Sequence, residues 1–98
     1  MIIANVLYKI KPGQRNAFLA ACREIGLLEN THKEKGNIAY DHYLPVHDEN
    51  AVFCAELWED ADAFTAHRSA PHVVKFQDVK KRYVADADLS VFEGARKE

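Results

Sequence analysis

Residues 2–10 read IIANVLYKI, and this stretch decides the fold. In an extended strand, the side chains of Ile2 and Tyr8 lie on one face, and those of Ile3 and Leu7 lie on the other. Both faces of the strand are therefore apolar. A strand that is apolar on both faces is buried on both faces, so each side of its sheet must be covered.

The same property recurs at residues 51–58, which read AVFCAELW. Between these two strands the apolar residues take the spacing of a helix, from Gln14 to about Lys33. Gly26 is expected to kink this helix or end it early. A further strand is predicted at 37–44, and it should form an antiparallel hairpin with the strand at 51–58.

The last forty residues continue the alternation of helices and strands. The pattern predicts a short helix to about Ser69, a helix from Pro71 to about Tyr83, a turn at 86–88 and a short strand at 89–92. The order strand, helix, strand, strand, helix, strand is the split βαβ pattern of an α+β, ferredoxin-like fold with a four-stranded antiparallel sheet. Its helices all lie on one face, so a second copy of the chain is expected to cover the other face in a homodimer.

Length and composition limit the remaining possibilities. The chain of 98 residues suits a single domain over 1–98, and the tail from about residue 94 is expected to fray. The net charge is −2 and the 13 basic residues are scattered, which argues against a nucleic-acid partner. We expect no membrane span and no secretory signal, and Cys22 and Cys54 are typical of core positions in a cytoplasmic protein.

Two histidines are the first candidates for chemistry. His67 and His72 share helix stripes with large apolar residues, so both should be partly buried. Histidine titrates near neutrality, which suits a general base. The alternative is that both imidazoles are packed side chains bonded to backbone carbonyls. Five residues separate them and Pro71 lies between, which is not the spacing of a helical metal pair, and we expect no metal.

Three further side chains are candidates for a pocket wall. Asn5 is expected to face the space between sheet and helices, where an amide orients a substrate carbonyl or hydroxyl, or else is only a buried polar residue. Tyr40 and Trp58 are expected to belong to the core or to the pocket wall. We expect His67 and His72 to flank one pocket, with Asn5 opposite them.

Several short runs together resemble one family. The chain is similar to the antibiotic biosynthesis monooxygenase domain over nearly its whole length, most specifically in the histidine followed by Ser-x-Pro-His. The runs that carry the resemblance are KPG at 11–13, KGNIAY at 35–40, FCAELWED at 53–60, AFTAH at 63–67 and SAPH at 69–72.

This resemblance implies a dimeric α+β barrel and a type of reaction. Members oxidise electron-rich aromatic or quinol-type substrates with O₂, often without metal or flavin. A base removes a substrate proton, and the resulting anion passes an electron to oxygen. His67 or His72 would be the base, no cofactor is expected, and the substrate contacts would come from Asn5, Trp58, Tyr40 and Phe76.

Other functions stay open at this point. The chain also resembles the phosphorylated autoinducer-2 isomerase, and such a substrate would call for basic residues at the pocket mouth, where Arg68 and Lys75 are candidates. Haem-degrading relatives share an asparagine at the position of Asn5. They have tryptophan where His67 stands and a haem ligand about where Gln77 stands, which argues against haem degradation here. A dimer that binds a small ligand without catalysis is the third possibility.

Overall fold

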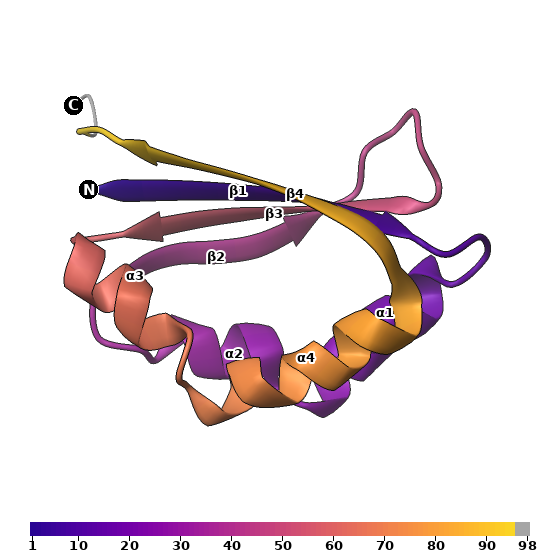
Figure 1. The fold of residues 1–98 in the computed structure, drawn as a ribbon, viewed down its shortest axis with the longest axis horizontal. Helices are drawn as coiled ribbons and strands as arrows, with labels where there is room; N and C mark the ends of the chain where they lie inside the picture. The colour runs from indigo at the N-terminus through magenta and orange to yellow at the C-terminus, as the bar shows by residue number, and fades with distance from the viewer. Residues whose placement is uncertain (96–98) are drawn as a thin grey trace.

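A computed structural model describes residues 1–95 and contains one antiparallel sheet with helices on one of its faces (Figure 1). The strands lie in the order β2-β3-β1-β4. They are β1 (Ile2–Ile10), β2 (Asn37–Tyr43), β3 (Ala51–Trp58) and β4 (Val84–Glu93). The helices are α1 (Arg15–Glu24), α2 (Leu27–His32), α3 (Ala61–His67) and α4 (Pro71–Tyr83). The predicted ferredoxin-like α+β fold is confirmed.

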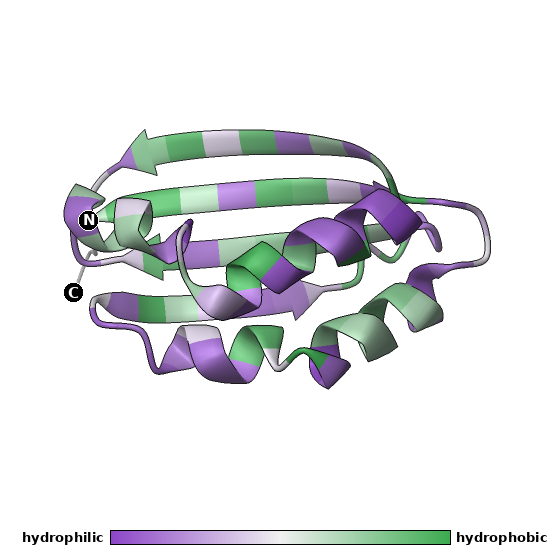
Figure 2. Ribbon diagram, turned by 60° about the horizontal axis from the view of Figure 1, so that its bottom comes forward, coloured by the Kyte–Doolittle hydropathy of each residue, from purple (hydrophilic) through white to green (hydrophobic). Residues whose placement is uncertain are grey.

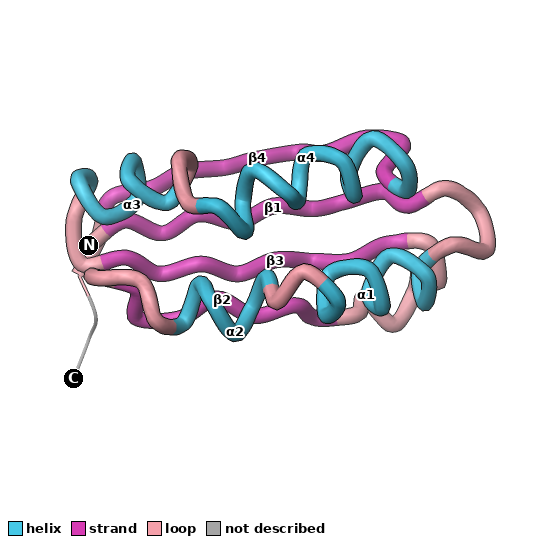
Figure 3. Tube along the Cα trace, turned by 90° about the horizontal axis from the view of Figure 1, so that it is seen from below, coloured by secondary structure: helices cyan, strands magenta, loops and turns pink. Residues whose placement is uncertain are grey.

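The helices form two rows beneath the sheet. Seen from below, α1 and α2 run along the side of β2, whereas α3 and α4 run along the side of β4 (Figure 3). None of the helices in the described part of the chain is long and apolar enough to cross a membrane.

The two central strands give the sheet its two different faces. Along β1, alternate residues from Ile2 to Ile10 are buried under the helices. Of those between them, Ile3, Asn5 and Leu7 are partly buried and Lys9 is exposed. The β1 strand, which begins at the N-terminus, carries mainly apolar residues along its length (Figure 2). In β3 the buried residues that face the helices are Val52, Cys54, Glu56 and Trp58. The sequence therefore predicted correctly that both central strands are apolar on both faces, but only one face is covered within this chain.

The last strand differs from its prediction. We expected a turn at 86–88 and a strand only at 89–92, whereas β4 runs from Val84 to Glu93 and pairs with β1 along almost its whole length. The acidic residues Asp86 and Asp88 led to the prediction of a turn. They are tolerated in this strand because β4 is an edge strand with most of its side chains exposed.

Two glycines set the course of the chain around the helices. Gly26 has a φ of +66° and separates α1 from α2, so the expected break in the first helix is confirmed. Gly36 has a φ of +84°, and a Cβ atom there would lie 2.5 Å from the Cβ of Ala63. Because Gly36 lacks that atom, the turn that follows α2 packs closely against α3. This contact brings Glu34 next to the end of α3.

The chain ends close to where it begins. The backbone N–H of Gly94 donates to the carbonyl of Met1, and the amino terminus donates to the carbonyl of Gly94. Pairing thus continues one residue past β4. The rest of the tail that we expected to fray includes residues 96–98, which lie outside the described residues.

Candidate functional site

One carboxylate oxygen joins the two candidate histidines. Glu34 Oε2 lies 2.7 Å from His67 Nδ1 and 2.8 Å from His72 Nε2. Pro71 begins α4 immediately before His72, and α3 ends at His67, so the two imidazoles come from adjacent helix ends. Their ring centroids are 6.1 Å apart. Both histidines are buried, as predicted, and Glu34 was not foreseen.

The contact with Glu34 determines where the protons lie on both rings. A carboxylate has only acceptor lone pairs, so each imidazole nitrogen that contacts it must carry a proton and donate it. His67 therefore donates from Nδ1, and His72 donates from Nε2. In the neutral form of His67, Nε2 is then the nitrogen with a free lone pair. Nε2 is therefore the atom at which neutral His67 accepts a proton.

The surroundings of His67 favour its neutral form. Burial lowers the pKa of His67, although the hydrogen bond and the charge of Glu34 act in the opposite direction. The ring also lies close to two aromatic side chains, with its centroid 4.8 Å from that of Trp58 and 5.4 Å from that of Tyr40. A histidine that is neutral at physiological pH and held in one tautomer can act as a general base.

The same three side chains are the only set of potential metal ligands among residues 1–95. Their nitrogen and oxygen atoms all lie within 4.8 Å of one another. Both imidazoles contact one and the same oxygen at ordinary hydrogen-bond lengths, so protons alone account for the arrangement. The expectation that no metal binds stays a prediction.

His67 borders a cavity of about 430 Å³ between the sheet and the α3–α4 row. Its walls combine aromatic rings, among them Tyr8, Tyr40, Phe64 and Phe76, with the polar side chains of Glu56, Arg68, Gln77 and Lys80. This size is typical of sites for small molecules. His72 is not among the described residues that line the cavity, so it contacts the site through Glu34 rather than directly.

A buried glutamate also faces this cavity. Glu56 on β3 has an exposed fraction of only 8%, and its Oε1 accepts a hydrogen bond of 3.1 Å from the indole N–H of Trp58. Burial raises the pKa of Glu56 to about 7, the Trp58 hydrogen bond lowers it, and the charge of Glu34 adds to the rise. Near neutral pH this carboxyl group is therefore both a possible proton donor and a possible acceptor.

Two of the predicted pocket side chains lie away from the cavity, and two others line it. We expected Asn5 to lie opposite the histidines, but it lies on the other face of the sheet, because side chains alternate along β1 and its neighbours Ala4 and Val6 are buried under the helices. Trp58 is fully buried beside Glu56 and does not line the cavity. Tyr40 and Phe76 do line it, and their contact with a substrate stays a prediction.

Two basic side chains border the cavity. Arg68 places its guanidinium carbon 5.2 Å from the ring centroid of Phe64, and Lys80 places its Nζ 5.3 Å from that of Phe76. Neither forms an ion pair with a carboxylate of the described chain. Arg68 was predicted for the pocket mouth, and it lines the cavity. The other predicted residue, Lys75, does not line the cavity, whereas Lys80 does.

Comparison with known protein families identifies the chain. A model of the family described as antibiotic biosynthesis monooxygenase matches residues 1–79. The chain is a member of the antibiotic biosynthesis monooxygenase family. It is 32% identical over 91 residues to "Putative monooxygenase YcnE" of Bacillus subtilis (strain 168), an alignment that covers 93% of each chain.

Solved structures extend the match to the fold. A structure from Nitrosomonas europaea has a TM-score of 0.88 at 21% identity, with 98% of this chain and 100% of that chain covered. A structure from Methanosarcina mazei Go1 has a TM-score of 0.86 at 19% identity, with 96% and 92% covered. These two structures show that the fold is shared. The family resemblance that the short motifs predicted is confirmed by the family model and by the relative from Bacillus subtilis.

Proposed function

We propose that this antibiotic biosynthesis monooxygenase family member oxidises a small aromatic or quinol-type molecule with O₂, without a metal or an organic cofactor. The observation that carries the proposal is the Glu34–His67 hydrogen bond at the edge of an aromatic-walled cavity. It supplies the one group that this chemistry requires of a protein, which is a base with a defined basic nitrogen.

The reaction begins with proton transfer. His67 Nε2 accepts the proton from an acidic C–H or O–H of the substrate, and Glu34 stabilises the imidazolium that forms. The substrate anion then transfers one electron to O₂, and the two radicals combine to form a C–O bond. Loss of water from the resulting peroxide leaves a new carbonyl group. For a substrate CH₂ group the balance is R₂CH₂ + O₂ → R₂C=O + H₂O.

The cavity walls suit the substrate of such a reaction. The rings of Tyr40, Phe64 and Phe76 offer faces and edges against which a flat aromatic molecule packs. Glu56, with its pKa near 7, is a suitable donor of the proton that the peroxide needs when it loses water. Trp58 supports this role indirectly, because it holds the Glu56 carboxyl group in place.

Oxygen uptake tests the proposal directly. Purified protein, treated with a chelator, is incubated with anthrone and 1,4-dihydroxynaphthalene in an oxygen electrode, and the products are analysed by mass spectrometry under ¹⁸O₂. We expect O₂ consumption above the uncatalysed rate, equimolar with product. With anthrone, the CH₂ group should become a carbonyl group that carries one labelled oxygen. With 1,4-dihydroxynaphthalene, oxygen should enter at a ring C–H and give a hydroxynaphthoquinone with one labelled oxygen, together with one water. Product that forms at the same rate without O₂ contradicts the proposal.

Arg68 and Lys80 support a second candidate function. Two cations without carboxylate partners at the cavity favour an anionic substrate, such as a phosphorylated hydroxy-carbonyl compound. An isomerase would use the same base to remove the proton next to the carbonyl and to return it at the neighbouring carbon. This reaction consumes no oxygen, so turnover of such a compound under strictly anaerobic conditions would favour the isomerase. Binding without turnover in either assay would favour a ligand-binding dimer.

A further inference from the structure

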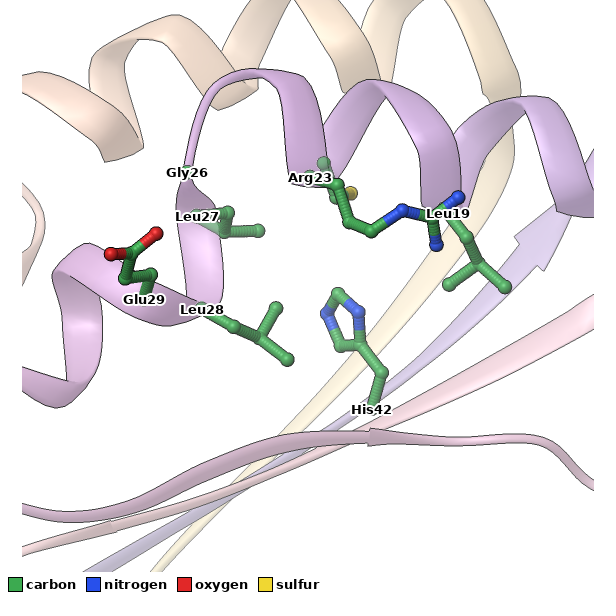
Figure 4. A pocket seen from close by; sticks show the side chains of 8 residues that line it. Leu19, Arg23, Gly26, Leu27, Leu28, Glu29 and His42 are labelled. Atoms are coloured by element: carbon green, nitrogen blue, oxygen red, sulfur yellow. The ribbon is translucent and has the colours of Figure 1, made fainter.

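A second cavity lies under the other row of helices. It has a volume of about 460 Å³ and lies where the bend at Gly26 turns α1 into α2 above the edge strand β2. Its walls are mainly the side chains of Leu19, Leu27 and Leu28, and the ring of His42 projects between them from the sheet (Figure 4). None of these residues belongs to the site described above.

His42 contributes a polar ring nitrogen to this cavity. Its Nε2 is buried, yet it has no hydrogen-bond partner within the described residues. Burial lowers the pKa of His42 to about 4, so the ring is neutral at physiological pH. A buried polar atom without a hydrogen bond costs free energy in the folded protein, and a bound molecule that contacts it recovers part of this cost.

One positive and one negative side chain lie at the rim of the cavity. Glu29 and Arg23 both border it. Glu29 lies 3.7 Å from Lys33 in an ion pair, whereas Arg23 has no ion pair with any carboxylate of residues 1–95. The guanidinium group is therefore free to bind an anion, and its planar fork suits a carboxylate in particular.

We propose that the cavity formed by α1, α2 and His42 is a second ligand site, which binds a small, mainly apolar carboxylic acid. The apolar part of the ligand packs against the three leucines, and the carboxylate pairs with Arg23. One of the ligand's polar atoms bonds to His42. The volume lies within the range of sites for small molecules, which is roughly 300–1,000 Å³.

This site is separate from the cavity that His67 borders. The ring of Tyr40 lines that first cavity, and its centroid lies 6.2 Å from the ring centroid of His42. Phe18 is fully buried, and its ring centroid lies 6.1 Å from that of His42 and 6.1 Å from that of Phe76, which lines the first cavity. A wall of aromatic rings therefore divides the two cavities, and ligands at each can be observed independently.

Octanoate and its neutral counterpart 1-octanol are the probes for this site. ¹H–¹⁵N NMR spectra of the full chain are recorded during a titration with each compound. We expect saturable shifts at the amides of residues 19–29 and a change in the ring ¹⁵N shifts of His42. Shifts confined to the residues around Phe64 and Phe76, or no saturable shift at all, would overturn the proposal.

Three variants test the parts of the site. Leu28→Trp fills the cavity and should weaken octanoate binding at least tenfold. If Leu28→Trp does not fold, His42→Phe gives an independent test. Arg23→Gln should weaken octanoate binding about three- to tenfold and leave octanol binding unchanged, whereas the matched control Arg82→Gln should change neither. Equal octanoate affinity in wild type, Leu28→Trp and His42→Phe would refute the site. An equal effect of Arg23→Gln on both probes would refute the carboxylate part.

Discussion

The two faces of the sheet carry the same kind of strand but have different surroundings. On the covered face, polar groups such as Glu56 and His67 are buried among aromatic rings and hydrogen-bonded to other side chains. On the open face, Ile3, Leu7 and Leu57 are only partly buried, and Phe92 on the edge strand is 54% exposed. The candidate site lies on one face, and the uncovered apolar surface lies on the other.

This difference shows that an apolar strand face predicts that the face is buried. It does not indicate whether the same chain or a second chain covers that face. The helices of the same chain cover one face because the connections β1–α1 and β3–α3 place all four helices on that side. For the open face we propose that a second copy of the chain supplies the cover. The strand pattern itself, with Asn5 as the one polar side chain of β1 between Ile3 and Leu7, favours a partner with the same apolar character.

The largest effect is expected from a charge placed on the open face. Leu57→Asp puts a carboxylate in the middle of the proposed interface, where an unpaired charge costs several kcal/mol when it is buried. Wild type should elute as a dimer with about twice the 11.1 kDa mass of one chain, and the variant should be monomeric or unfolded at micromolar concentration. Light scattering coupled to size exclusion measures the mass, and circular dichroism reports folding.

A matched control separates this effect from a general effect of added charge. Val46→Asp places the same charge in the loop between β2 and β3, where the side chain is fully exposed. This variant should keep the mass and the melting temperature of wild type. A wild-type chain that is already monomeric at this concentration refutes the proposed dimer.

On the covered face, the largest effect is expected at His67. His67→Ala removes the proposed base, and turnover should fall by about 10²- to 10⁴-fold. The matched control is His47→Ala in an exposed turn, which should keep wild-type turnover. Oxygen uptake with the best substrate measures both, together with thermal melts. If His67→Ala stays folded and keeps wild-type turnover, His67 is a structural residue.

Glu56 provides a test of stability rather than of turnover. Burial raises the pKa of its carboxyl to about 7, so between about pH 4.5 and 7 the folded state holds a proton that the unfolded state releases. Stability therefore falls as pH rises through this window, by up to about 3 kcal/mol. Glu56→Gln should lack this loss. The difference in unfolding free energy between the variant and wild type should thus grow in favour of the variant from pH 4.5 to 7.

Urea unfolding across this pH range measures the difference. Comparing the two proteins removes the contributions of His42 and His67, whose lowered pKa values change stability with the opposite sign. Glu49→Gln, at an exposed position, should run parallel to wild type at every pH. A constant difference between Glu56→Gln and wild type would mean that Glu56 titrates at its ordinary pKa.

Much of the covered face was predictable from local pattern. The bounds of β1 and β3, the break at Gly26 and the burial of His67 and His72 all follow from apolar spacing and glycine. The sequence also indicated that Glu56 lies on a buried strand face, which we did not predict. It lies at i+2 from Cys54 and at i−2 from Trp58, and a charged residue on a buried strand face marks a functional or paired carboxyl group.

The remaining features depend on contacts that no local pattern reveals. Glu34 stands in a polar run between two lysines, and only the close packing of the Gly36 turn on α3 brings it to the histidines. The position of Asn5 was wrong for a related reason. Both faces of β1 are apolar, so the sequence did not distinguish the face that the helices cover from the open one.

The smallest effect is expected from Glu34→Gln, which tests whether the covered face acts as one network. Glutamine keeps the size of the side chain and one acceptor oxygen but removes the charge that stabilises the imidazolium form of His67. The pKa of His67 should therefore fall further, because the hydrogen bond and charge of Glu34 now oppose the effect of burial. Turnover should fall about tenfold, since proton transfer to Nε2 becomes less favourable, and the pH at which activity rises should move down with the pKa. An NMR titration of the His67 ring nitrogens measures the pKa, and Glu29→Gln, on the exposed side of α2, serves as the matched control. An unchanged His67 pKa in Glu34→Gln would mean that the two side chains are neighbours without electrostatic coupling, and the base would then need a different partner.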